Sequence, residues 1–329
     1  MTNQPPEKNL ALELARVTEA AAMASARWQG RGDKNGADQA AVDAMRAVLS
    51  TIDMDGIVVI GEGEKDEAPM LFNGEKVGNG NAPLVDVAVD PVDGTRLTAL
   101  GMPGALAVIA FAERGSMYAP GKLVYMDKIA VGEAAAGMVD IEAPVAHNLK
   151  QVAKALGKSV SDVTAVILDR PRNEDYIAKV RQAGARITLI GDGDISGALS
   201  TAKLDSGVDV LFGIGGSPEA VTAACAMAAV RGEIQCKLWP RDDSERRFAI
   251  DEGLDLDQVI TTRDLVNSDN TFFAATGVTT GDLLKGVEFR GGNRVETHSL
   301  VMRSKTGTVR FVEAAHRMDE LGKISSVDY

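Results

Sequence analysis

The sequence has 329 residues, of which 45% are hydrophobic and 25% charged, and this composition excludes a largely disordered chain. That length accommodates one large or two medium-sized domains. The formal net charge of -12 argues against a nucleic-acid partner, because phosphate backbones require dense Lys and Arg. Two cysteines fit a reducing compartment, and neither a signal peptide nor a stretch of membrane-spanning length is present. We therefore expect a cytoplasmic protein without a membrane partner.

Two helices are predicted before the first strand. Apolar and small residues recur at helical spacing over residues 9–28 and again over residues 40–49. The polar run between them contains Lys34 and Asp38. From the pattern alone, Lys34 is an exposed surface lysine, and Asp38 is an acid favoured at the start of a helix by capping and the helix dipole.

Acidic residues follow the first two predicted strands. Residues 56–60 are followed by Gly61-Glu62-Gly63-Glu64-Lys65-Asp66, and a β-branched strand ending at Asp90 is followed by Pro91-Val92-Asp93-Gly94-Thr95. Pro91 fixes φ and Gly94 permits conformations that other residues resist, so we expect a sharp turn. Carboxylates that converge there require a cation, and oxygen ligands favour Mg²⁺ or Mn²⁺. An ordinary solvated loop remains the alternative on composition alone.

Further strands are predicted at residues 105–112 and 123–131, the latter carrying Tyr125 and Lys128. The pattern changes near Pro144, after which helices and strands alternate, as in an α/β layer. Helices are expected at 147–156, 174–183, 195–202, 219–230 and 242–251, and strands at 163–168, 187–190, 208–212, 258–260, 271–275, 299–303 and 308–314.

Each of the first three strands in this second half ends in polar residues. The loops are Asp169-Arg170-Pro171-Arg172, Gly191-Asp192-Gly193-Asp194 and Gly213-Ile214-Gly215-Gly216-Ser217-Pro218-Glu219. Ligands of open α/β sheets bind at the carboxyl ends of strands, so the three loops are expected to border one crevice. Guanidinium groups suit bidentate phosphate contact, whereas the paired aspartates would repel a dinucleotide pyrophosphate and suit sugar hydroxyls. The alternatives are a surface salt bridge for the arginines and a helix-start acid for Glu219.

The segment Asp90-Pro91-Val92-Asp93-Gly94-Thr95, with the upstream Gly-Glu element, resembles the signature of the lithium-sensitive, metal-dependent phosphatase superfamily. More closely, residues 30–35, 59–64, 67–70 and 213–216 resemble a bacterial class II fructose-1,6-bisphosphatase, and matching segments recur from about Asn9 to about His316. The resemblance implies a layered α/β/α/β sandwich of the sugar phosphatase type, with the active site between two α/β halves. We expect these halves at 1–145, with most metal ligands, and 146–329, with the substrate loops and Glu219.

The resemblance also implies the reaction, which is hydrolysis of the 1-phosphate of fructose 1,6-bisphosphate to fructose 6-phosphate in gluconeogenesis. A metal-activated water would be oriented by Thr95 together with Asp38 or Asp66, with Lys34 near the reacting phosphate. The implied ligands of Mn²⁺ or Mg²⁺ are Asp38, Glu62, Asp90, Asp93 and Glu219. The implied substrate-binding residues are Asp93, Gly94, Thr95, Tyr125, Arg170, Pro171, Arg172, Asp192, Gly193, Asp194 and Gly216.

The family resemblance further implies lithium sensitivity and a homo-oligomer, namely a tetramer, and the apolar helix surface over residues 10–22 favours such an assembly. Two residues depart from the family pattern: Asn173 stands where histidine is common, and Asp93 stands where some members have glutamate. Two other hypotheses remain open, an inositol-monophosphatase-like enzyme and a non-catalytic sugar-phosphate-binding regulator. Only a bisphosphatase requires the second cationic loop, and only the regulator would release no phosphate.

Overall fold

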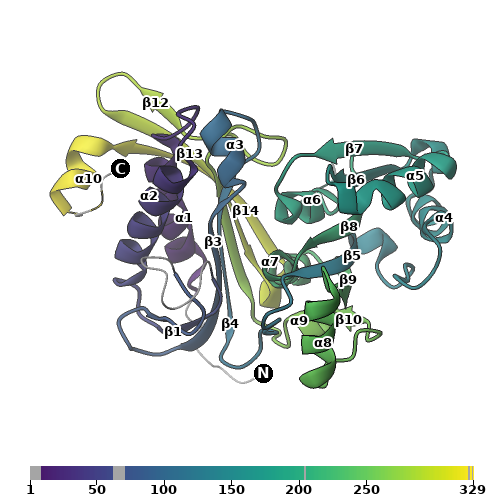
Figure 1. Ribbon diagram of the computed structural model, residues 1–329. Coiled ribbons are helices and arrows are strands. Elements are labelled where there is room, and N and C mark those ends of the chain that lie inside the picture. Colours follow the sequence, from purple (N-terminus) through teal and green to yellow (C-terminus); the bar gives the residue numbers. More distant parts are fainter. Residues whose placement is uncertain (1–8, 62–70, 204, 325–326, 328) are drawn as a thin grey trace, which may run out of the picture.

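The computed structural model describes residues 9–61, 71–203, 205–324, 327 and 329. These residues form two β-sheets with helices packed between and outside them (Figure 1). Two helices cover the outer face of the larger sheet, two lie between the sheets, and two cover the far face of the smaller sheet. In that order they are α1 (Ala11–Ala26), α2 (Lys34–Leu49), α6 (Asp194–Ser200), α7 (Ser217–Ala229), α4 (Val145–Leu156) and α5 (Glu174–Gln182). The expected α/β/α/β layering is confirmed, and α4 and α5 add a fifth layer.

The larger sheet contains eight strands, and β1 and β3 are its parallel neighbours. The carboxyl ends of these two strands therefore lie at the same edge of the sheet. In order, the strands are β12 (Glu288–Arg290), β13 (Arg294–Arg303), β11 (Phe272–Gly277), β4 (Leu106–Glu113), β3 (Leu84–Asp93), β1 (Asp55–Ile60) and β2 (Lys76–Val77), with β14 (Thr308–Arg317) also paired to β13.

The smaller sheet has six strands, of which β8, β6 and β7 run parallel. Their carboxyl ends meet at one edge, and the antiparallel strand β5 begins there, because Tyr125 pairs with Gly216. In order, the strands are β10 (Ile260–Thr261), β9 (Glu233–Leu238), β5 (Tyr125–Val131), β8 (Val210–Gly216), β6 (Thr164–Leu168) and β7 (Arg186–Ile190). The three polar loops of the second half thus share one edge of this sheet.

The two sheets divide the chain differently from the expected boundary at residue 145. Strand β5 belongs to the smaller sheet although it precedes that boundary, and β11–β14 belong to the larger sheet although they follow it. The cause is a long-range pairing: Phe272 of β11 pairs with Phe111 of β4, which returns the chain to the first sheet. Local patterns of apolar residues carry no information on such a pairing.

The remaining described helices are short. They are α3 (Thr95–Leu100), α8 (Asp243–Asp251), α9 (Thr262–Leu265), α10 (Met318–Ile324) and the 3₁₀ turns η1 (Glu133–Ala135), η2 (Val160–Asp162), η3 (Pro171–Asn173) and η4 (Ser304–Thr306). None of the helices within the described ranges has the combination of length and apolarity that crossing a bilayer requires. Of these short elements, only α8 was expected from the sequence, and strands β2, β9 and β12 were also not expected.

The apolar surface of α1 is covered by the chain itself. Leu10 and Leu14 are buried against α2 and the larger sheet, whereas Leu12 is 59% exposed. The apolar spacing over residues 10–22 therefore reflects core packing and gives no support to the expected oligomer, which stays a prediction.

One buried carboxylate in this helix lies outside the expected site. Glu19 is 8% exposed and accepts a hydrogen bond from Thr297 of β13 at 3.5 Å. Burial raises the pKa of Glu19 from 4.5 to about 7, and the Thr297 hydrogen bond and nearby Arg16 oppose this shift only in part. The folded protein holds this proton more tightly than the unfolded chain, so the resulting stabilisation is complete below pH 4.5 and lost as the pH rises through 7.

We predict that Glu19→Gln stabilises the protein above pH 7, because it removes the cost of ionising a buried carboxyl group. The gain is on the order of 3 kcal/mol at pH 8 and close to zero at pH 4. Thermal unfolding at both pH values measures it, with Glu13→Gln on the same helix as the control. An equal rise in melting temperature at both pH values would contradict this interpretation.

Candidate active site

One cavity of about 360 Å³ unites the loops that follow strands of both sheets. It is lined by Lys34, Asp90, Asp93, Gly94, Thr95, Arg96, Tyr125, Arg170, Arg172, Asp192, Gly193, Asp194, Gly216 and Glu219, with Val92 and Leu168. All the described residues of our expected site belong to this lining except Asp38 and Pro171. Glu62 and Asp66 lie outside the described residues, so their expected roles stay predictions.

The larger sheet contributes the junction of β3 and α3. We expected the strand to end at Asp90, but β3 continues to Asp93 and its pairing with β4 shifts register between these two residues. Asp90 Oδ1 accepts a hydrogen bond from the Val92 amide, and Thr95 Oγ1 donates one to the Val92 carbonyl, both at 3.1 Å. Gly94 has φ 90° and directly precedes α3. The turn is therefore built by an irregular strand end and a left-handed glycine, which together deliver Asp93 and Thr95 to the cavity.

The start of α2 is held beside this junction by the preceding loop. Gly30 and Gly32 donate backbone hydrogen bonds to the carbonyls of Thr98 and Ala99 in α3, at 2.9 and 2.8 Å. Lys34, the first residue of α2, consequently reaches the cavity.

The N-terminal cap of α2 is Asp33, which accepts a hydrogen bond from the Gly36 amide at 2.9 Å. Asp38 lies one turn further along and is buried. The capping interpretation of Asp38 is therefore wrong, because another aspartate fills that position.

Two glycines at the end of β8 leave space for the carboxylates of the smaller sheet. A Cβ atom on Gly215 would lie 2.0 Å from Asp194 Oδ2, and one on Gly216 would lie 1.7 Å from Glu219 Oε2. No side chain is compatible with these distances. The Gly-Ile-Gly-Gly run thus allows Asp194 and Glu219 to fold back against the backbone of the strand.

Asn173 connects the loop over residues 169–172 to strand β8 by hydrogen bonds. Its side chain is fully buried, accepts a hydrogen bond from the Ile214 amide at 2.7 Å and donates one to the Leu168 carbonyl at 3.1 Å. A Cβ atom on Gly213 would lie 2.9 Å from Asn173 Oδ1. The asparagine that departs from the family pattern therefore bridges β6 and β8, and it shares the Ile214 carbonyl with its neighbour Arg172.

Basic and aromatic side chains form the outer wall. Arg172 donates from Nε to the Ile214 carbonyl at 2.9 Å, and its guanidinium lies 4.4 Å from the centre of the Tyr125 ring. Arg170 forms an ion pair with Asp192, whose other oxygen lies 3.8 Å from Arg96. Arg96 was absent from our expected set, because nothing in the motif distinguishes it from an exposed helical arginine.

The inner wall concentrates negative charge in a buried space. Burial raises the pKa of Asp93 well above its usual range, and repulsion by Asp194, Glu219 and Asp192 adds to the shift. The pKa of Glu219 is also raised, first by burial and then by Asp194. These carboxylates are stable as anions together only if cations lie among them.

The donor atoms present fit divalent cations. Asp93 Oδ2 and Glu219 Oε2 are buried and have no hydrogen-bond partner within the described part of the chain. Such orphaned carboxylate oxygens are the hard ligands that Mg²⁺ and Mn²⁺ prefer. Among the described residues, no group of three or more His, Cys, Asp or Glu side chains is arranged closely enough to hold a metal ion. The expected ligand Glu62 lies outside those ranges.

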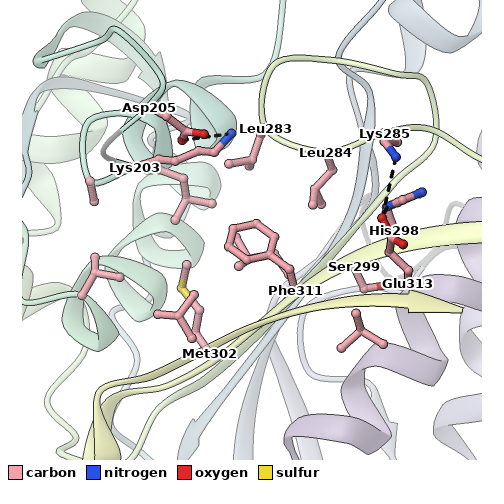
Figure 2. A pocket seen from close by; sticks show the side chains of 16 residues that line it. Lys203, Asp205, Leu283, Leu284, Lys285, His298, Ser299, Met302, Phe311 and Glu313 are labelled. Atoms are coloured by element: carbon pink, nitrogen blue, oxygen red, sulfur yellow. Dashed lines mark ion pairs between the residues drawn. The ribbon is translucent and has the colours of Figure 1, made fainter.

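A larger cavity of about 570 Å³ has a different character (Figure 2). Its floor is apolar, with Phe311 of β14 directed into it, and its charged residues pair with one another: Lys203 with Asp205, and both Lys285 and His298 with Glu313. It therefore lacks the convergent polar groups that a phosphate ester requires.

Comparison with known proteins identifies the family. The model of the family described as "Bacterial fructose-1,6-bisphosphatase, glpX-encoded" matches residues 8–316. The fructose-1,6-bisphosphatase class 2 of Haemophilus influenzae is 44% identical over 332 residues, covering 97% of this chain and 99% of that protein. The fructose-1,6-bisphosphatase 1 class 2 of Escherichia coli K12 is 46% identical over 326 residues, covering 95% and 96%.

These matches and the layered α/β fold define a phosphatase. The chain belongs to the bacterial glpX-encoded fructose-1,6-bisphosphatase family. The resemblance expected from the Asp-Pro-Val-Asp-Gly-Thr and Gly-Ile-Gly-Gly segments is thus confirmed over nearly the whole chain.

We predict that Gly216→Ala lowers kcat by at least about 100-fold, because the added Cβ must displace the Glu219 carboxylate. The melting temperature should fall only slightly, since Glu219 can swing into the cavity. Steady-state kinetics with thermal unfolding measure both effects, and Gly291→Ala, whose Cβ would meet nothing within 4 Å, is the control. Full activity in Gly216→Ala would mean that Glu219 has no role at this position.

Proposed function

We propose that this chain hydrolyses the 1-phosphate of fructose 1,6-bisphosphate to fructose 6-phosphate and inorganic phosphate, as a step of gluconeogenesis. One observation carries the proposal: the lining of a single cavity combines buried carboxylates from both sheets with three arginines and a tyrosine. The names of the relatives, each a fructose-1,6-bisphosphatase, agree with this substrate. The inner carboxylates suit the reacting phosphate with its cations, and the outer basic group suits the second phosphate.

The divalent cations in this proposal are Mn²⁺ or Mg²⁺. Asp90, Asp93 and Glu219 would hold them, with Asp38 and Glu62 as further ligands. When bound, such cations withdraw charge from the phosphoryl oxygens, stabilise the leaving alkoxide and lower the pKa of a coordinated water. The orphaned oxygens of Asp93 and Glu219 support this assignment.

Thr95 orients the attacking water in the proposed reaction. Its hydroxyl proton is donated to the Val92 carbonyl, so the lone pairs of Oγ1 are left to accept a hydrogen bond from water. Asp38 or Asp66 then takes the second proton, and Lys34 neutralises charge on the phosphate. Phosphoryl transfer depends mainly on such positioning and charge neutralisation, so no covalent phosphoenzyme is needed.

The far phosphate is held by Arg170, Arg172 and Tyr125 in this proposal. Stacking of Arg172 on the Tyr125 ring and its hydrogen bond to Ile214 reduce the freedom of the guanidinium, which favours a fixed bidentate contact. Asp192, Gly193 and Asp194 line the same cavity, and in this proposal their oxygens accept hydrogen bonds from the sugar hydroxyl groups.

The direct test is phosphate release from fructose 1,6-bisphosphate by the purified chain with Mn²⁺ or Mg²⁺. We predict activity that EDTA abolishes, that millimolar lithium inhibits, and that Asp90→Asn lowers by about 100-fold or more. Asp175→Asn, on the exposed face of α5, is the matched control. Binding of the sugar bisphosphate without any phosphate release would favour the non-catalytic regulator instead.

A second test separates the bisphosphatase from an inositol-monophosphatase-like enzyme. Arg172→Ala should raise KM for fructose 1,6-bisphosphate by about 10- to 100-fold, because a charged hydrogen-bonding partner of the second phosphate is lost. Its effect on small monophosphates should be slight. Paired kinetics with Arg181→Ala, an exposed arginine of α5, measure the difference, and equal losses for both substrate classes would refute the assigned contact.

We also propose that the enzyme works as a homotetramer in the cytoplasm. The long edge strand β14 supports assembly, since Phe311 is 60% exposed and Val309 40% beside the apolar cavity (Figure 2). The buried, unbridged Cys225 and Cys236 fit a reducing compartment. Sedimentation equilibrium of the purified chain measures its oligomeric state.

A further inference from the structure

Lys128 is a buried lysine immediately behind the candidate active site. It lies on β5, is 2% exposed and does not line the cavity. Removing an ammonium group from water is costly, and an ion pair with further hydrogen bonds offsets this cost. A lysine in this position therefore indicates a specific need for a fixed cation.

The ammonium group joins two loops of the smaller sheet. Its Nζ lies 2.6 Å from Asp194 Oδ2 and donates a hydrogen bond to the Gly216 carbonyl at 2.5 Å. Asp194 follows β7, whereas Gly216 ends β8, and β6 lies between these two strands. Lys128 consequently fixes the loop over residues 191–194 relative to the end of β8, which precedes Glu219 in the chain.

The fit around this ion pair is close. Asp194 Oδ2 and Lys128 Nζ lie 2.0 and 3.1 Å from the point where a Cβ atom of Gly215 would stand. The pair thus occupies the space that the glycine leaves open. Among the described residues, Lys128 is the side-chain partner that holds the Asp194 carboxylate against β8.

The buried carboxylates differ in what neutralises them. Asp194 is paired with Lys128 inside the protein. Asp93 and Glu219 each have a buried oxygen without a hydrogen-bond partner in the described part of the chain. The Lys128 charge also acts on Asp93 and Glu219, but among these three carboxylates Lys128 forms an ion pair only with Asp194, so the orphaned oxygens of the other two are left to cations from solution.

We propose that Lys128 is a positioning residue that keeps Asp194 on the substrate side of the site and prevents it from becoming a ligand of the divalent cations. The inference rests on the proposed function, because it assigns Asp194 to the sugar and Asp93 and Glu219 to the cations. It explains why a lysine, with three donors on a compact head, stands here instead of an apolar residue.

The test is calorimetric titration of metal-free protein with Mn²⁺, for the unaltered chain, Lys128→Met, Asp194→Asn and the double variant. Lys128→Met should bind Mn²⁺ about tenfold more tightly, because a freed carboxylate joins the site. Its kcat/KM should nevertheless fall about tenfold or more, since Asp194 leaves the sugar. The double variant should bind Mn²⁺ within about threefold of the unaltered chain and be no less active than Asp194→Asn alone.

Lys237→Met is the matched control, because Lys237 lies on the adjacent strand β9 and pairs with Glu142 away from the site. It should change neither Mn²⁺ affinity nor kcat/KM.

Unchanged or weaker Mn²⁺ binding by Lys128→Met would overturn the inference, as would the absence of Mn²⁺ binding altogether. If Lys128→Met fails to fold, the double variant decides, and a loss of affinity above about tenfold would show that Asp194 is itself a ligand. The titration needs no substrate, so a chain that binds Mn²⁺ but releases no phosphate would refute only the proposed function.

Discussion

The central constraint on this protein is mutual repulsion among carboxylates that the fold forces into one buried space. Asp93 comes from the larger sheet, whereas Asp194 and Glu219 follow strands of the smaller one. Repulsion from the neighbouring carboxylates adds to burial in raising the pKa values of Asp93 and Glu219. Repulsion of this kind would open the interface between the layers unless cations offset it. Lys128 on β5 meets part of this requirement through its ion pair with Asp194, and we propose that divalent ions held by Asp93 and Glu219 meet the rest.

The rest of the architecture serves this convergence. The end of β3 in one sheet and the ends of β6, β7 and β8 in the other border the same cavity, and the first turns of α6 and α7 contribute Asp194 and Glu219 to its lining. Glycines at the end of β8 remove the Cβ atoms that would collide with Asp194 and Glu219. The same loops carry the arginines outward, so that negative charge lies inside and positive charge outside, which suits a ligand with two phosphates.

Much of this arrangement could be predicted from the sequence. Runs of β-branched residues that end in acids or glycines identified the strands bordering the site, because burial and turn chemistry act over short distances. The irregular end of β3 at Asp93 and the capping of α2 by Asp33 were missed, since both depend on choices between neighbouring residues that composition does not resolve. The return of β11–β14 to the first sheet was also missed, because pairing partners far apart leave no local pattern.

The role of Lys128 illustrates the same limit within the site. Its sequence context is a strand, and nothing there distinguishes a buried lysine from one at the surface. Only the packing of β5 beside β8 reveals that its ammonium group reaches Asp194 and the Gly216 carbonyl.

The central claim is that divalent cations are shared between Asp93 of the larger sheet and Glu219 of the smaller one. Its most direct test is anomalous diffraction at the manganese edge from crystals soaked in Mn²⁺. The expected result is a peak within about 2.5 Å of carboxylate oxygens from both Asp93 and Glu219. The absence of such a peak, or one that contacts only a single sheet, would contradict the claim.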